Sequence, residues 1–118
     1  RRWQATAPRD APAAGPVPAS ANRTRIAVAV DAIEALARKR VKFREALRGV
    51  SVLQRNGLLD TSAGGVRILT RGSHMVFHGP GGTATLVREH GGMAHMPGPI
   101  FVRRMRAIAA TAGAELDD

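Results

Sequence analysis

Apolar residues recur at helical spacing in the first half of the chain. Between about Arg25 and Arg48 they recur at intervals of three, four or seven residues, which is typical of an amphipathic helix. This apolar face consists of Ile26, Val30, Ile33, Leu36, Ala37, Phe43 and Leu47. Gly49 interrupts the pattern, which resumes and then ends at the stop signal Asn56-Gly57. We therefore expect a helical segment over residues 25–57, formed either by one long helix with a break or by two helices.

A second helical pattern follows Pro97-Gly98-Pro99 near the C-terminal end. Pro99 suits the first turn of a helix, where its missing N–H would be unpaired in any case. Gly113 is a natural C-terminal stop. One face of this helix is apolar and is expected in the core; it consists of Phe101, Met105, Ile108 and Ala112. Arg103 and Arg106 point away from that face.

Short apolar and β-branched runs separated by turn signals lie between the two helical stretches. The expected strands are Val66–Leu69, His74–His78 and Thr83–Val87. Arg71-Gly72 and Gly79-Pro80-Gly81-Gly82 form the turns between them, and residues 58–65 form a loop. Three such strands make an antiparallel meander, and the helices on either side of it in sequence can cover one sheet face. The expected fold class is a two-layer α+β domain.

The 118 residues suffice for one domain. Residues 1–24 are rich in Pro and Ala and are expected to form a disordered tail. Residues 25–57 are expected to form a basic helical segment. Residues 58–118 are expected to form a β-β-β-α core that uses the preceding helix as its first helix.

The net charge points to an anionic partner. Lys and Arg number 18 against 9 Asp and Glu, which gives a formal charge of +9 and favours phosphate backbones or anionic lipid. No apolar run approaches the ~20 residues of a membrane-spanning helix. Cysteine is absent, which excludes disulfides and thiol nucleophiles. We expect a cytoplasmic protein that binds nucleic acid and no membrane.

The basic residues cluster in the first helical segment. Its polar face carries Arg38, Lys39, Arg40, Lys42, Arg44 and Arg48. This face is either an ordinary solvated surface, a track for RNA, or the surface that an acidic partner covers. The aromatic residues number only four, and the three Phe are expected to be needed in the core. Contacts to RNA should therefore run through Arg, Lys, His and backbone donors rather than through stacked rings.

Residues 64–113 combine these elements with a short motif. Gly64 precedes Gly72-Ser73-His74 on the second strand, and the apolar pair Val76-Phe77 follows. The third strand runs into the segment 86–90, Leu-Val-Arg-Glu-His, and the last helix contains residues 104–113, Arg-Met-Arg-Ala-Ile-Ala-Ala-Thr-Ala-Gly. In this order the segment resembles the HicA toxins, the mRNA interferases of bacterial toxin–antitoxin systems.

The resemblance implies a fold, an activity and a partner. The fold would be the α-β-β-β-α arrangement of double-stranded-RNA-binding domains (dsRBD-like), here with an N-terminal helical extension. The activity would be that of an endoribonuclease that needs no cofactor, and the partner would be a HicB-like antitoxin. The family's essential histidine falls on His74, and its strand-end histidine falls on His90, whose role is open between structure and RNA binding.

The residues around His74 also suit this chemistry. Metal-independent RNA cleavage needs a base for the ribose 2′-hydroxyl, an acid for the leaving oxygen and a positive group for the phosphorane. Histidine, with an unperturbed pKa of ~6.5, suits the proton transfers, and arginine suits the charge. His74 is the candidate catalytic residue, with Arg71 and Arg88 as phosphate partners. Gly72 allows a close approach of backbone to phosphate, and Ser73 can donate a hydrogen bond to it.

Other interpretations of the histidines remain. His74 could be a surface residue of a strand, and His78 a solvent-facing turn residue on the same strand face. His74 and His78 lie about 13 Å apart by strand rise, too far to share one metal ion, and no metal site is expected. His95 lies in a loop and has no expected role.

Two other function classes also fit the sequence. A non-catalytic nucleic-acid-binding module on the same fold would bind RNA without cutting it. A protein-interaction domain would pair its basic helix with an acidic partner. The sequence leaves the oligomeric state open.

Overall fold

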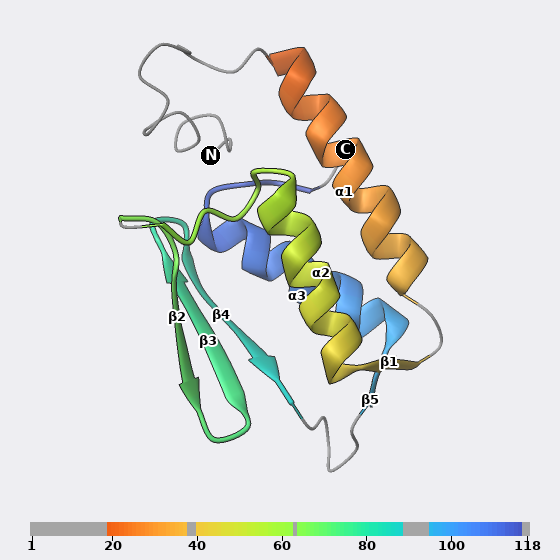
Figure 1. The fold of residues 1–118 in the computed structure, drawn as a ribbon, viewed down its shortest axis with the longest axis vertical. Coiled ribbons are helices and arrows are strands. Elements are labelled where there is room, and N and C mark those ends of the chain that lie inside the picture. Colours follow the sequence, from red (N-terminus) through yellow and green to blue (C-terminus); the bar gives the residue numbers. More distant parts are fainter. Residues whose placement is uncertain (1–18, 38–39, 63, 89–94, 117–118) are drawn as a thin grey trace.

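A computed structural model describes residues 19–37, 40–62, 64–88 and 95–116. Within these ranges three helices and five strands follow one another (Figure 1). In chain order they are α1 (Ala19–Leu36), β1 (Arg40–Lys42), α2 (Phe43–Arg55), β2 (Arg67–Arg71), β3 (His74–Gly79), β4 (Gly82–Val87), β5 (His95–Pro97) and α3 (Gly98–Thr111). The expectation of an α+β fold is confirmed.

The expected meander is present as an antiparallel sheet in the order β2-β3-β4. Each strand begins or ends within two residues of its predicted bounds. Two tight turns join the strands, because Arg71 pairs with His74 and Gly79 pairs with Gly82. The turn signals in the sequence therefore fixed the register of both hairpins.

A second, two-stranded sheet was not predicted. β1 pairs antiparallel with β5, so that Val41 lies opposite Met96. Both of these side chains are buried, whereas Arg40 and Lys42 are exposed. This small sheet ties the segment between α1 and α2 to the start of α3.

The helical segment at 25–57 consists of two helices, and the break was expected in the wrong place. It lies at β1, whereas Gly49 is buried inside α2. A Cβ at Gly49 would lie 2.8 Å from both Sδ of Met105 and Cζ of Phe101, so the glycine allows α2 and α3 to cross closely. The basic run is likewise not one helix face, because Arg40 and Lys42 belong to β1. Arg38 and Lys39 lie outside the described residues.

The predicted tail is too long by the first turns of α1. This helix begins at Ala19, so residues 19–24 are helical, and residues 1–18 lie outside the described part. The Pro/Ala-rich composition suggested a tail that continues to residue 24. Residues 19–24 contain no proline, and alanine favours a helix, so the helix begins directly after Pro18. α1 contributes Ala29 and Ile33 to the core.

The last helix agrees with its prediction. α3 begins after Pro97 with Pro99 in its first turn, and Gly113 follows its C-cap with φ +86°. All four residues of its predicted apolar face are buried, namely Phe101, Met105, Ile108 and Ala112. α3 packs against β4 and β3, and α2 packs against α1 and α3. Among the described helices, α3 therefore covers most of the buried face of the sheet.

The β3–β4 turn is held against the C-terminal end of α3. The Gly81 N–H donates to the carbonyl oxygen of Thr111 at 2.8 Å, which satisfies one of the last carbonyls of the helix. A Cβ at Gly81 would overlap the carbonyl oxygen of Ala110. The turn and the helix end thus need a glycine at this position.

Gly81→Ala is expected to destabilise the fold by about 1–3 kcal/mol, because the backbone must shift to relieve this overlap. Chemical denaturation of the full chain measures the change. Pro80→Ala is the matched control, since Pro80 is exposed in the same turn and should change the free energy of unfolding far less. Equal stability of Gly81→Ala and wild type would show that the turn does not pack on α3 in this way.

Candidate functional site

The three-stranded sheet has two faces of different character. Side chains alternate between the faces along each strand, and one set, including Phe77, Ala84 and Leu86, is buried beneath α3. The opposite set forms what we call the open face. It consists of Arg67, Leu69 and Arg71 from β2, His74, Val76 and His78 from β3, and Thr83, Thr85 and Val87 from β4.

The open face is exposed to solvent among the described residues. Leu69 is 45% exposed although it is a large apolar residue. Arg67, Arg71, His74 and Thr83 are exposed as well. No described helix packs on this side, so a ligand can approach the sheet directly there.

The turn Arg71-Gly72-Ser73-His74 closes one end of the open face. Arg71 and His74 are opposite each other in the register, so their side chains leave the sheet on the same side. Gly72 has φ +57°, and a positive φ at the first central residue alone is the pattern of a type II′ turn, which favours glycine there. The turn therefore places Arg71 and His74 opposite each other on one face of the sheet.

The Ser73 side chain contacts the imidazole at this turn. Its hydroxyl lies 3.4 Å from Nδ1 of His74, which leaves Nε2 as the ring nitrogen not engaged by this contact. Nothing lies within 4 Å of the position that a Cβ on Gly72 would take. An approaching phosphate therefore meets open backbone between the two side chains.

His78 occupies a different environment on the same strand. Its Nδ1 lies 3.2 Å from the hydroxyl oxygen of Thr83 on β4, its register partner. Arg67 lies opposite it on β2. His78 is half-buried and His74 is exposed, so the two histidines differ in access although they share a face.

Arg88 does not join His74 on the open face. Its guanidinium carbon lies 5.4 Å from the centre of the Phe43 ring at the start of α2, a cation–π arrangement. Its backbone N–H donates to the carbonyl oxygen of Ser73 at 2.7 Å. The backbone of Arg88 therefore lies beside the turn, whereas its side chain points to the helix side of the sheet.

The predicted site residues thus separate into two groups. The structure brings Arg71, Gly72, Ser73 and His74 together at one turn. It places the Arg88 guanidinium over Phe43 on the helix side of the sheet, so it does not bring this expected phosphate partner together with His74. The reason is strand alternation: Val87 pairs with His74, and the next residue points to the other side. His90 lies outside the described residues.

Two features of this region were missed in the sequence. One is the contact between Phe43 and Arg88, which joins residues far apart in the chain and has no local signal. The other is the extent of the open face over Leu69, Val76 and Thr85. The alternation of the three strands, counted outward from the Arg71–His74 pair, would have identified it.

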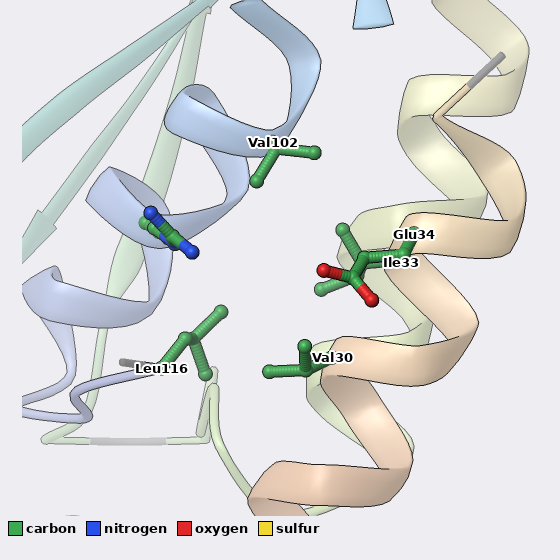
Figure 2. A pocket seen from close by; sticks show the side chains of 6 residues that line it. Val30, Ile33, Glu34, Val102 and Leu116 are labelled. Atoms are coloured by element: carbon green, nitrogen blue, oxygen red, sulfur yellow. The ribbon is translucent and has the colours of Figure 1, made fainter. Parts of the chain in front are cut away.

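A shallow cleft lies elsewhere, between α1 and α3 (Figure 2). It is lined by Val30, Ile33, Glu34, Val102, Arg106 and Leu116. None of these residues belongs to the sheet, so the cleft is separate from the open face. Its mostly apolar lining suits packing between the two helices.

The described residues offer neither a metal site nor a membrane-spanning helix. They contain no group of three His, Asp or Glu side chains close enough to hold a metal ion together. Within the same ranges no helix has the length and apolar character needed to cross a membrane.

Comparisons of the chain with protein-family models, with curated proteins and with solved structures gave no match. The function must therefore be inferred from the geometry of the site.

Proposed function

We propose that the chain is a HicA-like endoribonuclease whose reaction is centred on His74. The observation that carries the proposal is the juxtaposition of Arg71 and His74 on the open face. A general acid–base residue beside a phosphate-binding cation, both accessible to a polymer, is what cleavage of an RNA backbone requires. The net charge of +9 favours the same polyanionic substrate.

The proposed reaction uses the ribose 2′-hydroxyl as nucleophile. His74 takes the 2′-hydroxyl proton, the 2′-oxygen bonds to phosphorus, and the bond from phosphorus to the 5′-oxygen breaks. The 5′-oxygen receives a proton, which the imidazolium of His74 can return. Arg71 balances the negative charge that develops on the phosphoryl oxygens, and Ser73 orients the ring through its 3.4 Å contact to Nδ1.

The order of elements supports a dsRBD-like arrangement for the catalytic part. α2, β2, β3, β4 and α3 follow one another as in the α-β-β-β-α pattern, with the β1–β5 sheet and α1 as additions. On this proposal the protein acts in the cytoplasm, and a HicB-like antitoxin neutralises it by covering the open face.

Expression in a bacterial host tests this proposal. The wild-type chain should arrest growth and deplete mRNA, and coexpression of an antitoxin encoded beside it should relieve both effects. A small acidic open reading frame next to the gene is the protein to coexpress. Unimpaired growth and intact mRNA at confirmed expression of the full chain would contradict a toxin function.

One observation favours a second candidate, a nucleic-acid-binding module without catalysis. Because Arg88 lies on the helix side, the described part of the open face presents His74 with Arg71 and without the second phosphate partner. A binding module predicts salt-dependent RNA binding with no cleavage. Binding that is unchanged in His74→Ala and weakened in Arg71→Ala, with RNA left intact by wild type, would support this candidate over the ribonuclease.

A further inference from the structure

A chain of contacts leads from the His74 turn to the other side of the sheet. The Ser73 carbonyl accepts the Arg88 N–H at 2.7 Å, and the Arg88 guanidinium lies over Phe43. Phe43 is the first residue of α2 and follows β1 directly. In Figure 1 the β2–β3 turn, the end of β4, β1 and the start of α2 all lie toward the same end of the molecule.

Cationic residues lie on both sides of Phe43 in the sequence and further along α2. Lys42 and Arg44 flank Phe43 in sequence, and Arg48 lies one turn further along the same face of α2 as Arg44. All three are exposed, as are Arg40 and Arg88. We call these five residues the helix-side basic surface.

One carboxylate lies beside this surface at the start of α2. Glu45 is the acidic residue of the segment 40–55, and its Oε1 accepts the backbone N–H of Lys42 at 2.9 Å. Glu34 on α1 lies at the cleft between α1 and α3 (Figure 2). In the described segment 40–55, five cationic residues stand against the one carboxylate of Glu45, so the segment keeps a net positive charge.

We propose that a single-stranded RNA passes around this end of the sheet. Its reactive nucleotide lies on the open face at His74, and its flanking phosphates bind the helix-side basic surface. This inference rests on the proposed function for the position of the reactive nucleotide, and it names the substrate class as single-stranded rather than duplex RNA.

The stiffness of nucleic acid favours the single strand. Cations on both faces of one sheet end can be reached together only by a chain that turns sharply over a layer about 10 Å thick. The persistence length of duplex DNA is about 150 base pairs, so a sharp turn of a double helix over this short distance costs free energy, whereas a single strand can turn within a few nucleotides.

The aromatic residues favour backbone contacts over base stacking. Phe77 and Phe101 are fully buried, and the ring of Phe43 is partly covered by Arg88. Trp3 lies outside the described residues. Binding at the helix-side basic surface should therefore depend on phosphates and salt rather than on base identity.

The test compares two charge-reversal variants of the full chain. Arg44→Glu with Arg48→Glu alters the helix-side basic surface. Arg23→Glu with Arg103→Glu is the matched control, because it changes the net charge equally at exposed positions on α1 and α3. The probes are a labelled unstructured RNA of about 16 nucleotides, a blunt duplex of equal length, and a single strand of about 4 nucleotides.

The first variant should bind the longer single strand at least about tenfold more weakly at low salt, with a salt slope smaller by about 1.4 for two lost phosphate contacts. The control should stay within about threefold of wild type. Wild type should prefer the long single strand to the duplex. The control variant should cleave the strand of about 4 nucleotides at the wild-type rate, because neither Arg23 nor Arg103 belongs to the open face or to the helix-side basic surface.

Equal loss in both variants would overturn the proposal, as would equal binding of single strand and duplex. Poly-glutamate serves as a further probe, for an acidic protein. If the Arg44/Arg48 variant lost binding to poly-glutamate while its RNA binding stayed unchanged, the surface would be assigned to an acidic protein instead. The binding measurement needs no cleavage. If wild type cut no RNA but only the Arg44/Arg48 variant lost the single strand, the surface would stand and the ribonuclease proposal would fail.

Discussion

His74→Ala should lower the rate of RNA cleavage by roughly 10²- to 10⁴-fold, the contribution of a positioned general acid or base. The side chain is exposed at a turn, and its polar contact within the described structure is to Ser73. Its removal should leave the core intact, so the loss would be one of chemistry rather than of folding. Cleavage of a single labelled RNA by the purified full chain, with circular dichroism to check the fold, measures this effect.

His78→Ala is the matched control for this experiment. His78 lies on the same strand and the same face, four residues away, with its ring against Thr83. Its variant should cleave RNA at nearly the wild-type rate. Full activity of His74→Ala would remove His74 from the reaction, and an equal loss in both variants would indicate that the histidines support the sheet face rather than the chemistry.

Phe77→Ala is expected to lower the free energy of unfolding by about 3–5 kcal/mol, the usual cost of removing a buried aromatic side chain. Phe77 is fully buried in the middle of β3, where α3 covers the sheet. Truncation would leave a cavity between sheet and helix that the closely packed core cannot close. Denaturant titration followed by circular dichroism gives the value.

Leu69→Ala on the neighbouring strand is the control for the sheet faces. Leu69 is 45% exposed on the open face, so its truncation should change stability by no more than about 0.5 kcal/mol. Together the two variants report which face packs against α3. If Leu69→Ala were the costly change and Phe77→Ala the mild one, His74 would lie on the covered face and could not meet RNA.

The elements with strong local signals were predictable. Pro99 and Gly113 bound α3 because each acts through its own backbone. Gly72 and the segment Gly79–Gly82 likewise fixed both turns of the meander. Once the turns are known, alternation places His74 and Arg71 on one face, and the structure confirms this pairing.

The features that depend on distant parts of the chain were not predictable. Glycine costs about 1 kcal/mol in a helix interior, so Gly49 suggested a break. In the structure it lies inside α2 because Phe101 and Met105 pack closely over it. The strands β1 and β5 are three residues each and pair across more than fifty residues of sequence, so neither has a pattern of its own.

The candidate site shows the same limit. The composition around His74 suggested that Arg71 and Arg88 share one phosphate. Only the register of β3 and β4, together with the position of Phe43, shows that Arg88 turns to the helix side. The two arginines were named from the sequence, but Arg71 lies on the open face and Arg88 lies on the helix side of the sheet.

The most direct test of the central claim is the identity of the RNA ends. The chain is incubated with a single RNA in excess chelator, and the fragments are analysed by mass spectrometry. Attack by the 2′-hydroxyl, assisted by His74, predicts a 2′,3′-cyclic phosphate, or the 3′-phosphate from its hydrolysis, opposite a 5′-hydroxyl. Fragments with 5′-phosphate and 3′-hydroxyl ends, or RNA left uncut, would contradict it.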